Sequence, residues 1–217
     1  MNLEYWLQSW KLNHIGFNQN NPNTYMQQYF PLLKLPKEAR ILAPLCGKSI
    51  DMLWMLKQGY QVLGIDISRL ACESFFKENH LAYKEIKQDG RVFFEGKNIS
   101  LWVGDFFDLD TKMLGAVDAV YDRASLIALP EKSRQQYAGF INDILSPGVK
   151  VLLIAVTYDQ TKMQGPPFSV NETEVKVLFS KYFSITKLHD KPAQSLPLHL
   201  QEKGLDSATN QIYLMVK

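Results

Sequence analysis

The chain has 217 residues, 46% of them hydrophobic and 21% charged, which is the size of one domain and the composition of a globular protein with a core. Its 24 basic and 22 acidic residues leave a formal net charge of only +2. Such a small charge argues against nucleic-acid and membrane-surface partners, which usually require a clear basic excess on one face.

Aromatic residues crowd the beginning of the chain, where Trp6, Trp10 and Phe17 follow one another closely. A disordered tail would be poor in such residues, so this segment is expected to pack on another part of the protein. It lacks the basic region and apolar stretch that mark a secretory signal. The sequence contains no apolar run of about eighteen residues, so no membrane-spanning helix is predicted.

Apolar runs and amphipathic stretches alternate along the remainder of the chain. In order, the pattern predicts a helix over 24–34, a strand over 40–45, a helix over 49–58, a strand over 61–66, a helix over 68–79, strands over 92–94, 99–103 and 116–121, a helix over 130–145, a strand over 149–156, a helix over 171–181, and strands over 183–188 and 212–216. This alternation favours a largely parallel sheet with helices on both faces. Ligands of such sheets bind beyond the carboxyl ends of the strands, so the turns there are candidate sites.

The turn after the first strand, from Leu45 to Ser49, is the first candidate. Its Gly47 and Lys48 are similar to the end of a triphosphate-binding loop, but the position where that loop needs its first glycine holds Leu42. The dinucleotide fingerprint is also missing, because the turn has a single glycine. Taken alone, this turn is better interpreted as an ordinary connection between a strand and a helix.

Two further strand ends carry acidic residues. Asp66 ends the second strand, where a carboxylate can accept hydrogen bonds from both ribose hydroxyls of an adenosine cofactor. The alternative is a surface aspartate that caps the next helix. Asp105 follows the strand over 99–103, and a polar residue there can bond the edge of an adenine that an aromatic neighbour stacks. That neighbour is Phe106 or Phe107, and one of the pair is expected to lie in the core.

Asp122 and Arg123 follow the strand over 116–121 and admit two interpretations. The pair is structural, or Arg123 supplies positive charge to a carboxylate or an anionic nucleophile. Together, these turns describe an α/β enzyme that binds an adenosine cofactor without a diphosphate-binding loop. This combination favours S-adenosylmethionine over NAD, because the diphosphate is the group that needs a glycine-rich approach.

The two cysteines, Cys46 and Cys72, form neither a disulfide framework nor the paired spacing of a zinc site, and a reducing cytoplasm is the expected compartment. The four histidines show no metal-ligand spacing either, so no metal site is predicted. Cys46 has no base nearby in the sequence, so a backbone contact with the cofactor is expected rather than a covalent role.

Several separated motifs, in order, resemble the thiopurine S-methyltransferases, in particular their bacterial branch. These motifs are WLQSWKLNHIGF (6–17), PLCGKSIDMLWMLKQGYQVLGIDIS (44–68), ISLWVGDFFDL (99–109), YDRASLIALP (121–130) and GPPFSV (165–170). The resemblance covers nearly the whole chain. It implies a three-layer α-β-α, Rossmann-like methyltransferase fold with a seven-stranded, mostly parallel sheet whose last strand is antiparallel.

The resemblance also implies roles for particular residues. The cofactor would be bound by Trp10, Leu45, Asp66, Asp105, Phe106 and Arg123. The acceptor would be bound by Phe17, Arg123 and Phe168, with Arg123 as the catalytic residue. Position 66 is usually glutamate in this family, so the shorter Asp66 is expected to shift or loosen the ribose contact while retaining its chemistry.

The implied activity is S-adenosylmethionine-dependent methyl transfer to the sulfur of small aromatic or heterocyclic thiols such as thiopurines, or to selenium or tellurium species. No general base is expected to be obligatory. The chain would be one domain over 1–217, with a lid over 1–36 and the cofactor-binding sheet and substrate loops over 37–217. A cytoplasmic monomer without a nucleic-acid or membrane partner is expected. A nicotinamide-dependent oxidoreductase and a cofactor-binding module without catalysis remain alternatives.

Overall fold

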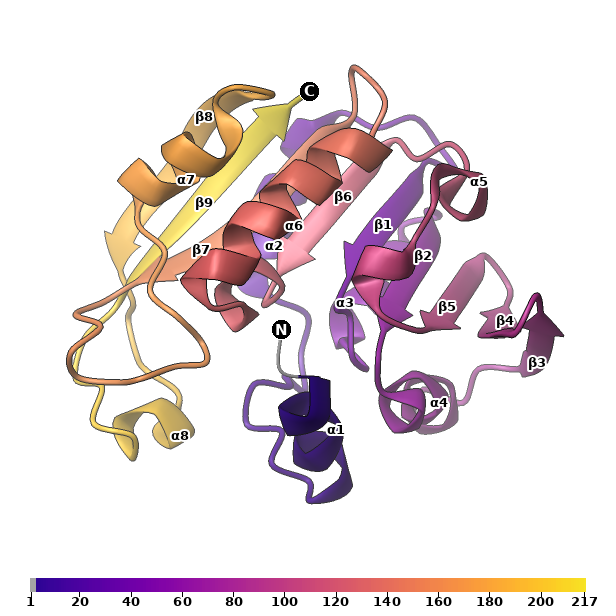
Figure 1. Ribbon diagram of the computed structural model, residues 1–217, viewed down its shortest axis with the longest axis horizontal. Helices are drawn as coiled ribbons and strands as arrows, with labels where there is room; N and C mark the ends of the chain where they lie inside the picture. Colours follow the sequence, from indigo (N-terminus) through magenta and orange to yellow (C-terminus); the bar gives the residue numbers. More distant parts are fainter. Residues whose placement is uncertain (1–2) are drawn as a thin grey trace. The chain divides into compact units, whose positions relative to one another are not determined.

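A computed structural model describes residues 3–217, which divide into two compact units, one ending at Tyr121 and the other beginning at Asp122. Both units combine strands with helices, which confirms the predicted α/β class (Figure 1). Within residues 3–217, no helix has the length and the apolar character needed to cross a bilayer.

The N-terminal unit contains most of the strands. In chain order its elements are α1 (Leu3–Lys11), α2 (Thr24–Tyr29), the 3-10 helix η1 (Phe30–Leu33), β1 (Arg40–Pro44), α3 (Ile50–Lys57), β2 (Gln61–Asp66), α4 (Arg69–Glu78), β3 (Tyr83–Gln88), β4 (Arg91–Gly96), β5 (Ile99–Val103), the 3-10 helix η2 (Phe106–Asp108), α5 (Thr111–Leu114) and β6 (Ala119–Arg123), which runs into the second unit. The predicted strand over 116–121 therefore begins and ends later than expected, and Pro31 accompanies a change from α to 3-10 helix inside the predicted helix over 24–34.

The strands of this unit lie in the order β3-β4-β5-β2-β1-β6. β5, β2, β1 and β6 are parallel, and Figure 1 shows β5, β2 and β1 side by side. β1 and β2 are buried almost throughout because helices of the α/β arrangement cover a parallel sheet on both faces. This continuous burial explains why apolar runs located both strands correctly in the sequence.

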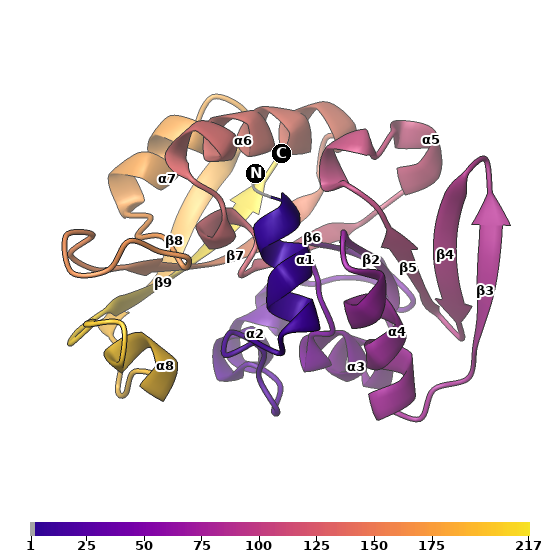
Figure 2. The ribbon, with the colours of Figure 1, turned by 60° about the horizontal axis from the view of Figure 1, so that its bottom comes forward.

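The implied count of seven strands is wrong, since the described residues form nine. β3 and β4 add an antiparallel hairpin to the edge of the sheet beside β5 (Figure 2). β3 has the sequence YKEIKQ and is largely exposed, so no hydrophobic pattern marks it. Its charged residues are typical of an edge strand that resists pairing with other chains.

The C-terminal unit continues with the 3-10 helix η3 (Leu126–Ala128), α6 (Glu131–Ile144), β7 (Lys150–Thr157), α7 (Glu172–Phe179), β8 (Ser184–Pro192), α8 (Leu198–Gln201) and β9 (Thr209–Val216). Its strands lie in the order β7-β9-β8, and β9 is antiparallel to both neighbours. The implied antiparallel last strand is thus confirmed. Buried apolar side chains from β7, α7 and β9 form the core of this unit.

Short polar residues begin the helices that follow the strands. Ser68 caps α4 by accepting a hydrogen bond from the Ala71 N–H, and Asn171 caps α7 by accepting one from the Glu174 N–H. Ser49 caps α3 in the same way, through the Asp51 N–H. These caps fix where each strand stops and its helix starts, and so they fix the turns that carry the candidate site.

Candidate functional site

Three turns of the N-terminal unit meet at Asp66. The Cys46 N–H donates to the Ile65 carbonyl at 2.9 Å, and the Gly104 N–H donates to the Asp66 carbonyl at 3.0 Å. The Gly47 N–H donates to the Asp66 carboxylate at 2.7 Å. The ends of β1, β2 and β5 are therefore joined by hydrogen bonds around one acidic residue, at the carboxyl edge where ligands of parallel sheets bind.

The Asp66 carboxylate is held on both oxygens. Oδ2 accepts from Gly47, while Oδ1 accepts from the Ser68 N–H at 2.8 Å. The residue is only 7% exposed, and this burial raises the pKa of Asp66 to about 6, although the two backbone donors favour its ionised form. Each carboxylate oxygen has a further lone pair, so the group can still accept two hydroxyl hydrogen bonds.

The turn after β1 has an unusual backbone. Leu45 adopts a left-handed conformation with φ +46°, which a residue with a branched side chain rarely adopts. Such strain concentrates where the backbone itself contacts a ligand. Cys46 is buried next to it, and burial, with the nearby Asp66 charge, raises the pKa of the Cys46 thiol well above its ordinary value. The thiol is therefore not activated as a nucleophile.

The aromatic residues at the start of the chain pack on this turn. A Cβ placed on Gly47 would lie 2.7 Å from the Trp10 ring, so the indole rests directly on the glycine. Phe17 contacts both Trp6 and Trp10 edge to face, with 5.5 Å between ring centroids in each pair. α1, which carries Trp6 and Trp10, also contacts α4 (Figure 2). The predicted packing of this segment is confirmed, and its partner is the turn beside Asp66.

We expect Gly47→Ala to destabilise the protein in two ways, through backbone strain in the turn and through loss of the contact with Trp10. Gly47 has φ +51°, where an alanine costs about 1–2 kcal/mol, and the new Cβ would also displace Trp10. Gly59→Ala is the matched control, because Gly59 has φ +89° and no heavy atom within 4 Å of the added Cβ. Denaturation should show a larger loss of unfolding free energy for Gly47→Ala, with an altered tryptophan emission spectrum. Equal losses and unchanged emission would contradict the packing role of Gly47.

The turn after β5 places its two aromatic residues differently. Phe106 is completely buried, whereas Phe107 is partly exposed. Asp105 is partly exposed and caps η2, since its Oδ1 accepts a hydrogen bond from the Phe107 N–H at 3.1 Å. Phe106 thus lies in the core beneath the turn, whereas Asp105 lies partly exposed just after β5.

Arg123 lies in the C-terminal unit at the end of β6, where it is partly exposed. The next residue, Ala124, has a left-handed backbone with φ +62°, so the chain bends directly after Arg123. The buried Asp122 carboxylate holds the bend by accepting hydrogen bonds from the Leu126 N–H at 3.1 Å and the Tyr137 hydroxyl at 2.7 Å. Burial raises the pKa of Asp122 to about 6.

Phe168 belongs to the same unit and is partly exposed. Its N–H donates to the Ile127 carbonyl at 2.7 Å, which joins the 165–168 loop to η3 shortly after Arg123. The sequence assigned these residues to one site, and the structure places Trp10, Phe17, Leu45, Asp66, Asp105 and Phe106 in the N-terminal unit and Arg123 and Phe168 in the C-terminal unit.

One buried acidic and one buried basic residue were not predicted from the sequence. Asp51, in the first turn of α3, accepts hydrogen bonds from the Asn23 N–H at 2.7 Å and the Tyr121 hydroxyl at 2.9 Å, and so connects the start of α2 to β6. Arg134 lies on the inner face of α6 with Tyr137. A charged residue within the apolar stripe of a helix was the available signal for Arg134, because such residues are rarely buried without a partner.

Comparisons with known proteins agree with one another. The family model described as thiopurine S-methyltransferase matches residues 1–217. A thiopurine S-methyltransferase of Nitrosospira multiformis is 40% identical, with 100% of this chain and 98% of that protein covered. One from Pseudomonas fluorescens is 38% identical, with 98% of each covered.

Two solved structures show the likeness of fold. Magnesium protoporphyrin IX methyltransferase from Synechocystis PCC 6803 has a TM-score of 0.65 at 14% identity, with 99% of this chain and 94% of that one covered. A SAM-dependent methyltransferase from Anabaena variabilis has a TM-score of 0.66 at 16% identity, with 100% of this chain and 95% of that one covered. The methyltransferase fold is therefore confirmed. The full-length matches to the relatives and to the family model show that the chain belongs to the thiopurine S-methyltransferase family, whose members are S-adenosylmethionine-dependent methyltransferases.

Proposed function

We propose that this protein methylates the sulfur of small aromatic or heterocyclic thiols such as thiopurines, or selenium and tellurium species, with S-adenosylmethionine as the methyl donor. The observation that carries the proposal is the buried Asp66 carboxylate at the junction of three turns. Its support comes from relatives named thiopurine S-methyltransferase along the whole chain.

The residues around Asp66 fit an adenosine group. The carboxylate has acceptor capacity left on both oxygens for ribose hydroxyls, and the left-handed Leu45 directly follows β1 at the same edge of the sheet. Asp105 lies at the next turn with an oxygen for the exocyclic amine of an adenine. The absence of a glycine-rich loop also fits, because this cofactor has no diphosphate.

Different residues of the chain would have different roles in methyl transfer. When bound, S-adenosylmethionine would supply an activated methyl group, and its transfer to an acceptor thiolate would release S-adenosylhomocysteine as a neutral thioether, so no acid–base help is required. Arg123 would hold the acceptor in its anionic form and orient it, because its guanidinium stays charged at any physiological pH. Trp6, Trp10 and Phe17 would exclude water from the reacting groups, and Phe168 would bind the flat face of the acceptor.

The lid over 1–36, the single working domain over 1–217, the monomeric state and the cytoplasmic location are part of the same proposal. Trp10 on the turn at Gly47 supports the lid. The small net charge supports a small-molecule acceptor over a nucleic acid.

An acceptor screen with labelled S-adenosylmethionine tests the proposal directly. We expect label to appear on 6-mercaptopurine, thiophenol or selenite-derived acceptors, and thermal stabilisation by S-adenosylhomocysteine but not by NAD. Stabilisation by NAD alone would favour a nicotinamide-dependent oxidoreductase. Stabilisation by S-adenosylhomocysteine without transfer to any sulfur or selenium acceptor would favour a cofactor-binding module.

We expect cofactor affinity to fall as the pH falls through 6. The pKa of Asp66 in the folded protein is about 6, above its ordinary value of 3.8, so Asp66 is mostly ionised at pH 7.5 and only about one-tenth ionised at pH 5. Protonation removes an acceptor for the ribose hydroxyls, and the dissociation constant should rise by up to about tenfold. Calorimetry at the two pH values checks this, with Asp66→Asn as a control that lacks the titration.

Stability should change in the opposite direction without the cofactor. Because the folded-state pKa of Asp66 is raised, folding favours its neutral form, and its contribution to the free energy of unfolding is fully present below pH 4 and is lost as the pH rises through 6. The buried Asp122, whose pKa is also raised, changes the free energy of unfolding in the same direction.

An affinity for the cofactor that is equal at pH 5 and 7.5 would contradict the proposed contact between Asp66 and the ribose.

A further inference from the structure

Arg134 is a buried arginine that the proposed mechanism does not use. It is 5% exposed and lies on the inner face of α6, with Tyr137, Ala138 and Ile141. Burying a guanidinium is expensive unless its charge and its donors are satisfied, so the groups that satisfy it show what it holds.

The guanidinium contacts three separate segments of the C-terminal unit. Nη1 donates to the Leu129 carbonyl at 2.7 Å, directly after η3, and Nε donates to Glu174 Oε1 on α7 at 2.5 Å. Its Cζ lies 5.9 Å from the centre of the Phe168 ring, within the range of a cation–π contact. One side chain thus connects η3, α7 and the 165–168 loop.

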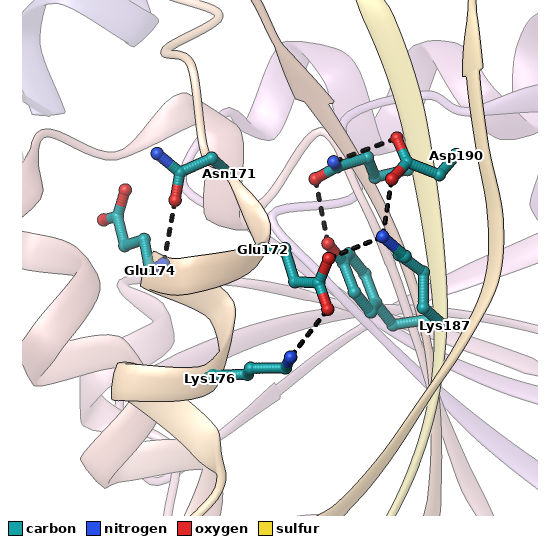
Figure 3. A network of polar contacts seen from close by, with 8 residues as sticks. Asn171, Glu172, Glu174, Lys176, Lys187 and Asp190 are labelled. Carbon is teal, nitrogen blue, oxygen red and sulfur yellow. Dashed lines mark hydrogen bonds and ion pairs between the residues drawn. The ribbon is translucent and has the colours of Figure 1, made fainter.

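Glu174 is a firmly placed partner. Its N–H donates to the Asn171 side chain at 2.9 Å. The same first turn of α7 is joined to β8 through Glu172, which pairs with Lys187 at 2.5 Å (Figure 3). Lys187 also pairs with Asp190 at 2.5 Å, and this lysine is held between the two carboxylates as Figure 3 shows. Isolated surface pairs contribute little, but a network of this kind fixes the geometry of the helix end.

Phe168 is held from two more directions. Its N–H donates to the Ile127 carbonyl at 2.7 Å, and a Cβ on Gly165 would lie 2.7 Å from its ring, so the ring packs directly against that glycine. Two carbonyls near the end of η3 therefore accept hydrogen bonds. The Ile127 carbonyl accepts one from the Phe168 N–H, and the Leu129 carbonyl accepts one from the Arg134 guanidinium. The ring still keeps a partly exposed face.

We propose that Arg134 is a positioning residue that sets acceptor specificity by holding the Phe168 ring and the 165–168 loop in place. The proposal rests on the proposed function, in which Phe168 contacts the acceptor. Arginine suits this task because its planar group donates along two edges while a face remains for a ring, whereas lysine offers a single charged point.

Two variants of Arg134, one of Glu174 and one control at Arg91 test the proposal. Arg134→Met removes all three contacts, Arg134→Lys keeps the charge beside Glu174, and Glu174→Gln tests the pair if the methionine variant does not fold. Arg91→Met is the matched control, because the Arg91 Cζ also lies 5.9 Å from a ring, that of Trp102, and Arg91 also pairs with a carboxylate, that of Asp110.

Two readouts distinguish positioning from general stability. The first is the ratio of kcat/KM for 6-mercaptopurine to that for thiophenol, which is independent of the folded fraction. We expect Arg134→Met to change this ratio at least fivefold, Arg134→Lys to change it less, and Arg91→Met to leave it unchanged, with the dissociation constant of S-adenosylhomocysteine within twofold of wild type. The second is hydrogen exchange at the Phe168 amide, which should lose at least tenfold of its protection in Arg134→Met while β7 and β9 amides keep theirs.

The outcomes distinguish failure of the proposed thiol methylation from failure of the positioning role of Arg134. A wild-type protein that methylates no thiol contradicts the proposed function, and the exchange experiment still measures whether Arg134 holds Phe168. Unchanged exchange at the Phe168 amide overturns the positioning role. Equal losses of activity on both acceptors, with exchange raised throughout the unit, overturn it in favour of a purely structural role.

Discussion

Arg123→Ala is expected to lower kcat for thiol acceptors by about 10²–10³-fold, the usual effect of removing one preorganised charged or hydrogen-bonding group from a reacting anion. Without the guanidinium, the acceptor is no longer favoured as a thiolate and is no longer oriented for displacement. The affinity for S-adenosylhomocysteine should fall much less. Steady-state kinetics with labelled S-adenosylmethionine, together with calorimetry, measures both quantities.

The acceptor series and a conservative variant sharpen this test. The loss should be larger for acceptors whose thiol has a higher pKa, because these depend more on the protein for ionisation. Arg123→Lys should retain part of the activity, since it keeps the charge but loses the planar donors. A turnover equal to wild type for Arg123→Ala on a thiopurine would remove Arg123 from the proposed mechanism.

The second large effect is expected at Asp66. Asp66→Ala should weaken cofactor binding by about 1–3 kcal/mol, because a charged hydrogen-bond acceptor for the ribose is lost. The Gly47 and Ser68 N–H groups would also lose their shared acceptor, so the free energy of unfolding should fall as well. Calorimetry and denaturation measure the two losses separately.

Asp66→Glu is the matched control for this variant. It restores a carboxylate with a side chain longer by one methylene group, and glutamate is the residue that the family resemblance implies for this position. We expect it to bind the cofactor far better than the alanine variant. An alanine variant with wild-type affinity and lowered stability would show that Asp66 only holds the turns together.

The local part of the fold could be predicted from the sequence. β1, β2 and α4 were located within one or two residues, because buried parallel strands are continuous apolar runs and Ser68 is a local cap. β3 escaped prediction, since this polar edge strand is defined by its hydrogen bonds to β4 and not by a hydrophobic pattern.

The candidate site, like the fold, has a part that the sequence predicts and a part that depends on tertiary contacts. The sequence by itself determined the family, the acidic residue at the end of β2 and the motifs that contain Arg123 and Phe168, because these depend on residue types at short spacings. Only the tertiary structure decided that Trp10 rests on Gly47, that Asp66 holds Gly47, and that Arg134 joins Glu174 to Phe168. Those partners are separated along the chain, and their contacts exist only because sheet pairing and helix packing bring these segments together within each unit.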